Sequence, residues 1–226
     1  MDGDGSIQVN HWRKKNLQYR LVIKLKYTQP NHIMLQTISK YIGGYVRIVT
    51  NKNKSEVLWI ENNKKKIIKI IEIFKLYPPL TFRLFHQLKF LNDCLLNNDV
   101  NLYLKNRNQK YNQLGYYFLS VKEFIKVPYW NEWLSGFIEA EGCFSIRKIG
   151  TFSFSIGQNN DKIILHAIKE FFSIKSEVRL RKKTANFFIL ETFNKNSILN
   201  ICNHLKTYPL LGEKLITFNI ICDKFI

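Results

Sequence analysis

Two pairs of acidic residues stand at matching positions in the chain, and each pair is followed by a glycine and a strand-like run. The pairs are Asp2 with Asp4 and Glu139 with Glu141. Apolar side chains recur at helical spacing before the second pair, so Glu141 is predicted at the C-terminus of a helix that Gly142 ends in a left-handed conformation. The helix dipole disfavours a carboxylate at that end. Its presence therefore indicates function, and carboxylates are suited to bind a hard divalent cation.

The elements that would position these carboxylates repeat along the chain. The two acidic motifs are 137 residues apart, and the segments 77–83 and 208–214 recur almost in step with them. Residue patterns predict the same order in each half: two strands, a helix, two strands, and a pair of helices around a Tyr-Pro turn. The predicted strands are 6–12, 19–27, 44–50, 56–61, 143–148, 152–158, 177–182 and 187–192, and the helices between them are 31–42 and 160–172.

Residues 92–128 fit neither half of this repeat. They contain polar runs and end at Pro128. We interpret them as a linker with a helix near 119–126, and the alternative of a third helical subdomain stays open.

The nonapeptide at 134–142, Leu-Ser-Gly-Phe-Ile-Glu-Ala-Glu-Gly, resembles the motif that names the LAGLIDADG homing endonucleases, and residues 2–5 keep four of its positions. In that family two motif helices pack along a seam of small residues, which Gly136 and Ala140 would supply here. The resemblance implies an α+β protein with two pseudo-symmetric αββαββα-type halves. These halves would form a saddle of antiparallel β-sheets, with the motif helices at their interface.

The resemblance covers 1–91 and 129–226 as first and second repeats, and it implies a site-specific, double-strand DNA endonuclease encoded within an intron. A monomer would then supply both motifs. Two other functions stay open: an RNA-binding maturase that assists splicing of the intron on the same fold, and a decayed, non-catalytic DNA-binding protein. The partners implied are double-stranded DNA and, for the maturase, intron RNA.

The family's acidic residue at the eighth motif position holds the catalytic metal, and the matching residues here are Asp4 and Glu141. The implied cofactor is Mg²⁺ or another hard divalent cation, which activates water and stabilises the leaving oxygen. A basic residue of each half helps to polarise the attacking water and the phosphate. Its matches are Arg83 and Lys214, each the last residue of a Tyr-Pro segment.

The family often has a polar residue, frequently glutamine, at the end of the second strand of each half. Gln29 and Gln158 are the nearest matches and complete the candidate catalytic set.

Alternation along the strands predicts one apolar and one basic or hydroxyl-bearing face on each sheet. Such a face suits a β-ribbon that reads the major groove, with further cations at strand turns to bind phosphates. The residues assigned to base reading are Arg20, Lys24, Lys26, Arg47, Ser153, Ser155, Arg179 and Arg181, and those assigned to phosphates are Lys14, Lys15, Lys182 and Lys183. The solvated outer face of a half-buried sheet would give the same pattern on any single strand.

Composition favours a polyanionic partner, because the formal net charge is +18 and the pI is about 9.7. Residues with AT-rich codons greatly outnumber those with GC-rich codons. This bias indicates an AT-rich genome, which is typical of organelles and also of some bacteria and protists. With the resemblance it predicts a mitochondrial, organelle-encoded protein without an import signal. No run approaches eighteen apolar residues, so no membrane-spanning helix is predicted. The four cysteines form no CxxC pair and are interpreted as reduced, mostly buried thiols.

The first motif begins at its fifth position in this chain. The partner helix for the seam is then missing, and the apolar residues Trp133, Phe137 and Ile138 are expected to lose cover. The resemblance therefore predicts a functional protein that begins upstream, with roughly ten or more helical, apolar-rich residues, and a less stable and less active 226-residue chain.

Overall fold

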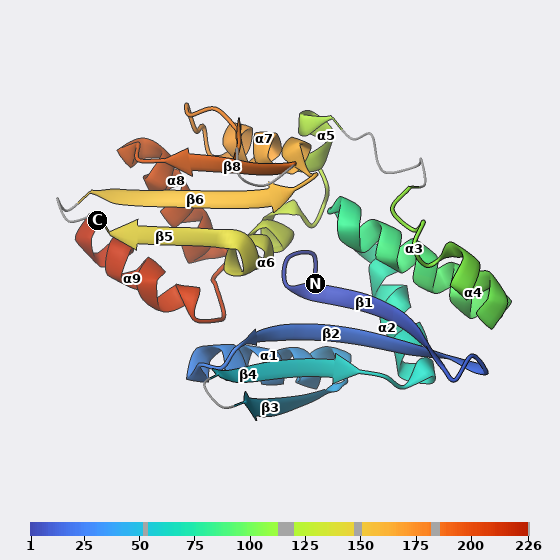
Figure 1. Cartoon of the computed structure of the whole chain (residues 1–226). Helices are drawn as coiled ribbons and strands as arrows, with labels where there is room; N and C mark the ends of the chain where they lie inside the picture. The colour runs from blue at the N-terminus through green and yellow to red at the C-terminus, as the bar shows by residue number, and fades with distance from the viewer. Residues whose placement is uncertain (52–53, 113–119, 147–150, 182–185, 226) are drawn as a thin grey trace. The chain divides into compact units, whose positions relative to one another are not determined.

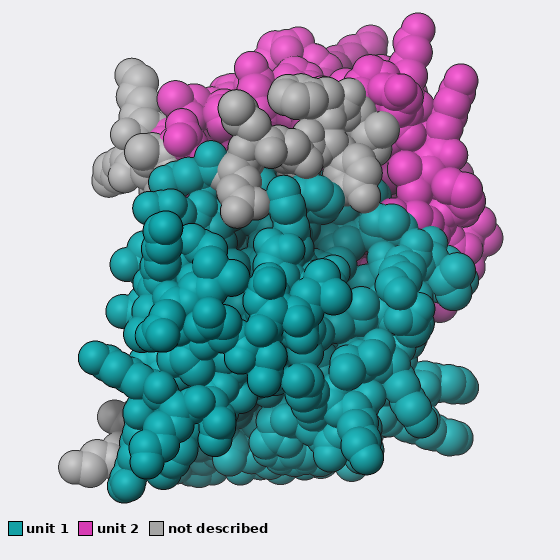
Figure 2. Space-filling view, turned by 90° about the vertical axis from the view of Figure 1, so that its right-hand side faces the viewer, with its two compact units in different colours: residues 1–117 teal, residues 118–226 magenta. Residues whose placement is uncertain are grey.

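The computed structural model describes residues 1–51, 54–112, 120–146, 151–181 and 186–225. The chain divides into two compact units, Met1–Tyr117 and Phe118–Ile226, which Figure 2 colours teal and magenta. Each unit contains one four-stranded antiparallel sheet with helices packed on it (Figure 1). The predicted α+β class and the predicted repeat of strands and helices are confirmed.

Unit 1 has the strand order β1-β2-β4-β3, with each neighbouring pair antiparallel. Helix α1 contacts β3 and β4, α2 contacts β2, and α3 contacts β1. The elements are β1 Gly5–Trp12, β2 Asn16–Lys26, α1 Gln29–Ile42, β3 Tyr45–Asn51, β4 Lys54–Glu61, α2 Lys64–Leu76, α3 Phe82–Asn97 and α4 Val100–Asn106.

The core of unit 1 lies on the helix-covered face of its sheet. Leu21, Ile23 and Trp59 from the sheet are buried against Leu35 of α1 and Leu84 of α3. The alternation of buried and exposed residues along β2 produces this face, as the sequence predicts.

Unit 2 repeats this arrangement with the strand order β5-β6-β8-β7. Helix α6 contacts β5 and β6, α7 contacts β6 and β8, and α9 contacts β5. The elements are α5 Val121–Ile125, α6 Trp130–Glu141, β5 Gly142–Ile146, β6 Phe152–Asn159, α7 Lys162–Phe171, β7 Arg179–Leu180, β8 Phe187–Thr192, α8 Lys195–Thr207 and α9 Lys214–Phe225. The predicted strand 177–182 is shorter in the structure, and residues 147–148 and 182 of the predicted strands lie outside the described residues.

The segment predicted as a linker is divided between the two units. Its first part completes α3 and forms α4, where Tyr103 is buried in the core of unit 1. Its last part contains α5, close to the predicted helix, which a capping box between Ser120 and Glu123 begins. Residues 113–119 lie outside the described part of the chain.

The apolar stripe of the motif helix α6 is buried as its spacing predicts. Leu134 and Ile138 have no exposed surface, and Phe137 is 2% exposed. The loss of cover expected around Phe137 and Ile138 is therefore not seen at these two side chains. Within unit 2, Gly136 is exposed, and no heavy atom lies within 4 Å of the position that its Cβ would take.

Gly142 has an extended backbone, with φ −70° and ψ 150°, so the predicted left-handed conformation is wrong. Glycine is required at this position because the atoms of Ile138 lie close to its Cα. A Cβ on Gly142 would lie 2.7 Å from the carbonyl oxygen of Ile138 and 2.9 Å from Ile138 Cγ2. The motif helix thus turns directly into β5 over its own last turn.

Gly142→Ala is therefore expected to lower the free energy of unfolding by about 1–3 kcal/mol, because the added methyl group forces the end of α6 away from β5. Urea unfolding followed by circular dichroism would measure the loss. Cys143→Ala, at the exposed neighbouring position, should leave stability within about 0.5 kcal/mol of the parent. An unchanged unfolding midpoint for Gly142→Ala would contradict the close approach.

Candidate active site and nucleic-acid face

The two carboxylates of the acidic pair in unit 1, Asp2 and Asp4, have different surroundings. Asp2 accepts hydrogen bonds from the Thr81 backbone N–H at 3.0 Å, the Thr81 hydroxyl at 2.6 Å and the Leu80 N–H at 3.4 Å. Thr81 is itself the N-cap of α3, so Asp2 ties the start of the chain to the start of that helix. Asp4 lies two residues further on in the same turn and is exposed.

Arg83 holds the backbone of the turn that carries Asp4. Its guanidinium donates to the carbonyl oxygens of Gly5 at 2.6 Å, Asp2 at 2.8 Å and Gly3 at 2.5 Å. The Gly5 N–H in turn donates to the Met1 carbonyl at 3.0 Å. The planar fork of arginine suits this multiple contact, and its charge opposes the negative end of the motif turn.

Unit 2 builds the same arrangement around Glu139. This carboxylate accepts hydrogen bonds from the backbone N–H groups of Leu211 at 3.1 Å, Gly212 at 2.9 Å and Lys214 at 3.4 Å. It therefore binds the backbone that leads into α9, as Asp2 binds the N-cap residue Thr81 at the start of α3. Glu141 follows two residues later as the last residue of α6, as predicted.

Lys214 occupies the place of Arg83 in unit 2. Its ammonium donates to the carbonyl oxygens of Ala140 at 2.5 Å and Ile138 at 3.4 Å. A cation at the C-terminus of α6 satisfies carbonyls that the helix leaves unpaired and offsets the dipole next to Glu141.

Each unit thus has a pair of carboxylates at the end of its motif, and the same types of contact hold both pairs. Asp2 and Glu139 bind backbone N–H groups of the segments that follow the two Tyr-Pro turns, a role that the sequence did not indicate. The structure brings Arg83 to the turn that carries Asp4, and Lys214 to the helix end that carries Glu141. A joint site of Asp4 and Glu141 stays a prediction.

The face of the unit 1 sheet opposite its helices carries the predicted cations. Strand pairing sets Arg20 opposite Gln8, Lys24 opposite Leu58, and Lys26 opposite Glu56, while Arg47 on β3 also faces Leu58. Lys24 forms an ion pair with Glu56 at 2.7 Å. Lys14 and Lys15 are exposed in the turn between β1 and β2. We call this surface the polar face of unit 1.

The corresponding face of unit 2 carries the predicted hydroxyl groups. Ser153 is buried and Ser155 is half-buried, and Ser155 pairs with Glu191 across the sheet. Arg179 forms an ion pair with Glu191 at 3.2 Å. Arg181 is exposed directly after β7, where its N–H donates to the Phe187 carbonyl at 2.8 Å. Lys182 and Lys183 lie outside the described residues.

Gln158 lies at the end of β6, where the resemblance implies a polar residue, whereas Gln29 lies beyond the end of β2. Gln29 is the first residue of α1, three residues beyond the end of β2, and its Oε1 accepts from the Tyr27 hydroxyl at 3.5 Å. Gln158 alternates with Ser155 and Gly157, so it lies on the core side with Phe154 and Ile156, where it is 9% exposed. Neither belongs to the polar face of its sheet.

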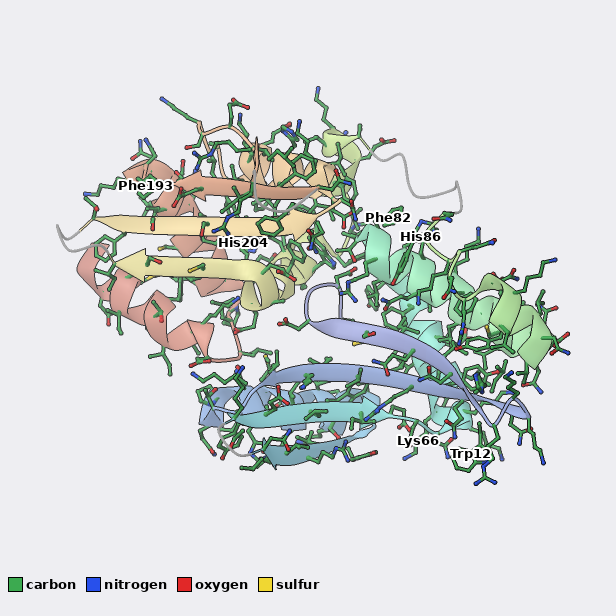
Figure 3. All side chains as sticks on the ribbon, in the orientation of Figure 1. Trp12, Lys66, Phe82, His86, Phe193 and His204 are labelled. Atoms are coloured by element: carbon green, nitrogen blue, oxygen red, sulfur yellow. The ribbon has the colours of Figure 1, made fainter. Side chains whose placement is uncertain are left out.

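A buried histidine connects the motif helix to α8 in unit 2. The ring of His204 lies 3.1 Å from the Ser135 hydroxyl of α6, and that hydroxyl donates to the Tyr208 carbonyl at 2.8 Å (Figure 3). Phe171 and Phe172 pack around the ring at 5.5 and 5.4 Å between centroids. Burial lowers the pKa of His204 from 6.5 to about 4.

This pKa makes the stability of unit 2 sensitive to acid. The unfolded chain takes up a proton on His204 as the pH falls through 6.5, whereas the folded unit does so only near pH 4. Stability is therefore lost between these values, and the histidine contributes a loss of about 2 kcal/mol between pH 7 and pH 5.

Urea unfolding at the two pH values would measure this loss. His204→Gln should remove the part of the pH dependence that His204 causes. Burial also lowers the pKa of His166, but this residue is present in both proteins and does not affect their comparison. Equal pH dependence in the parent and the variant would contradict the assignment.

Three of the four cysteines, Cys94, Cys202 and Cys222, are buried and Cys143 is exposed. Burial raises the pKa of Cys94 to about 11 and that of Cys202 to about 12. Among the described residues, no group of three or more His, Cys, Asp or Glu side chains is placed to hold a metal ion. No described helix is long and apolar enough to cross a membrane.

The fold and site define an α+β protein of two units, and each unit has one pair of carboxylates at the end of its motif and one sheet face with polar side chains. The family model described as LAGLIDADG endonuclease matches residues 1–94 and 134–225. The chain belongs to this family, as its motif predicts.

Similar proteins support this membership. A Dictyostelium citrinum protein named probable intron-encoded endonuclease aI3 is 48% identical over 95% of this chain and 87% of its own length. A Debaryomyces hansenii protein of the same name is 41% identical over 95% of this chain, but the match spans only 35% of that protein. The solved structure of the LAGLIDADG meganuclease I-AabMI bound to uncleaved DNA superposes with a TM-score of 0.74 at 20% identity, over 99% of this chain and 87% of that one.

Proposed function

We propose that the chain is a site-specific, double-strand DNA endonuclease encoded by an intron of a mitochondrial genome. The observation that carries the proposal is a repeated arrangement. Each unit has a pair of carboxylates at the end of its motif, a basic side chain (Arg83 or Lys214) bound to the backbone of that motif, and a sheet face with polar side chains. A duplex offers two strands to cut, and two carboxylate ends on one chain allow a monomer to address both. The names of the relatives and the DNA-bound structural neighbour support this function.

Asp4 and Glu141 are the proposed ligands of the divalent cation, one from each unit. Oxygen donors of this kind fit a hard cation such as Mg²⁺, and Asp2 and Glu139 are already committed to backbone N–H groups. When bound, the cation would supply a Lewis acid and a water of lowered pKa. Arg83 and Lys214 orient the backbone on either side of these carboxylates, and a direct role in polarising water stays a prediction.

Cleavage of a plasmid that carries the uninterrupted insertion site of the host gene tests the function. The purified chain should linearise this plasmid in Mg²⁺, and should leave it intact in EDTA or when the intron interrupts the site. Specific binding of intron RNA without any DNA cleavage would overturn the proposal in favour of a maturase. Binding of the DNA site without cleavage would indicate a decayed, non-catalytic protein.

Binding should also depend steeply on salt, because the cations of the polar faces would release counterions from the DNA. The logarithm of the affinity is expected to fall by about 0.9 per phosphate contacted for each logarithmic unit of salt. Titration of one labelled duplex at several salt concentrations measures the slope. A nearly flat response would show that the positive charge of the chain does not contact DNA.

A further inference from the structure

The outer end of the β1–β2 hairpin carries a large aromatic side chain on the polar face of unit 1. Trp12 is 53% exposed at the end of β1, where it pairs with Asn16 (Figure 3). Alternation along β1 sets it on the side of Gln8 and Asn10, opposite the core residue Ile7. An exposed indole therefore lies on a face that carries basic and polar side chains together with the buried apolar residues Val22, Leu58 and Ile60.

The turn that presents Trp12 is held by its own contacts. Arg13 and Lys14 both have left-handed backbones, with φ of 47° and 55°. The Lys14 N–H donates to His11 Nδ1 at 3.1 Å, and the Lys15 N–H donates to the Trp12 carbonyl at 2.8 Å. These bonds fix a turn conformation that residues other than glycine rarely adopt, so the side chain of Trp12 projects from a defined backbone.

Positive charge surrounds the exposed ring. The Arg13 guanidinium carbon lies 5.1 Å from the centre of the Trp12 ring, and Lys14 and Lys15 follow directly in the chain. A surface groove of about 620 Å³ is lined by Lys15, Arg20 and Arg47, among other residues. Some proteins that bind the minor groove combine phosphate-binding cations with an apolar side chain that they insert between base steps.

We propose that Trp12 packs its indole against a base step of duplex DNA at the outer end of the unit 1 half-site. The proposal rests on the proposed function and adds a contact that sets how far recognition extends. Trp12 lies seven residues along β1 from Gly5, a distance of about 24 Å at 3.4 Å per residue. This distance corresponds to roughly seven base pairs at 3.4 Å each.

The contact is expected in one half-site only. Counted from the motif glycines Gly5 and Gly142, the position of Trp12 corresponds in unit 2 to Ile149, which is not aromatic and lies outside the described residues. A tryptophan wedge would therefore mark one end of the target and leave the other end unaffected.

Duplexes of the uninterrupted insertion site, each with 2-aminopurine at one successive position, test the proposal. The parent protein should raise the fluorescence of positions near one end of the site, on one side only. Trp12→Ala should abolish this rise and weaken binding about tenfold, whereas Trp12→Phe should keep most of both. Tyr41→Ala is the matched control, because Tyr41 is 78% exposed on α1 and lies outside the polar face.

The outcomes separate this inference from the proposed function. Trp12→Ala with parental affinity and a parental fluorescence profile would overturn the wedge, even if the parent cuts the same duplex in Mg²⁺. A parent that shows the one-sided rise but never cuts would retain the wedge and refute the endonuclease. A fluorescence rise in both half-sites would also overturn the assignment to Trp12. An unchanged melting temperature for Trp12→Ala would confirm that the variant is folded.

Discussion

Glu141→Gln and Asp4→Asn are each expected to lower the rate of DNA cleavage by roughly a thousandfold or more, because each would replace a proposed, charged metal ligand by a neutral amide. The affinity for the target duplex should change by less than about threefold, since neither side chain belongs to the cations of the polar faces. Single-turnover cleavage in Mg²⁺ and a binding titration in Ca²⁺ would measure the two quantities separately.

The first acidic residue of each pair supplies the matched comparison. Glu139→Gln and Asp2→Asn alter carboxylates that accept backbone N–H bonds at the start of α9 and α3. These variants should lose about 1–3 kcal/mol of stability, because charged acceptors of backbone N–H groups are replaced. The Glu141 and Asp4 variants should retain their parental unfolding midpoints. Strong double-strand cleavage by either of the latter would refute the assignment of the metal ligands.

Local patterns predicted most of the fold, because the elements here follow their own periodicity. The alternation in β2 and the helical spacing in α6 each place apolar residues on one face, and both faces are buried in the structure. The ends of elements were predicted less well. Strand β7 is only Arg179–Leu180, since its length depends on pairing with β8, which the residues of β7 do not reveal.

The site was predicted in part, and the missing part is made of contacts distant in sequence. Asp2 lies 79 residues from Thr81, and Glu139 lies 73 residues from Gly212, so no local pattern marks these carboxylates as acceptors of these backbone N–H bonds. Gln158 lies at the end of β6, as the resemblance implies, and strand parity sets it on the core side of the sheet, so its catalytic role stays a prediction. Gly142 was predicted to have a left-handed backbone because it follows a helix. The structure requires glycine there for another reason, since a Cβ would clash with Ile138.

Arg83→Met is expected to slow cleavage by roughly 10- to 100-fold and to raise the Mg²⁺ concentration needed for half-maximal rate, as the loss of an outer-shell partner of a metal ligand does. The reason is that three carbonyls of the turn bearing Asp4 lose their donor. Lys214→Met should act in the same direction on the end of α6, with a smaller effect, because the ammonium makes two such bonds. Arg83→Lys should recover part of the rate, since it keeps the charge but not the planar fork.

The dependence on Mg²⁺ distinguishes positioning of the carboxylate from direct catalysis by the guanidinium. Lys89→Met, at an exposed position on the same helix α3, should leave both the rate and the metal dependence unchanged. If Arg83→Met lowers the rate at saturating Mg²⁺ without any shift in the half-maximal concentration, Arg83 acts on the water or phosphate itself. If the shift is present and excess Mg²⁺ restores the rate, the arginine serves the reaction by holding the turn that presents Asp4.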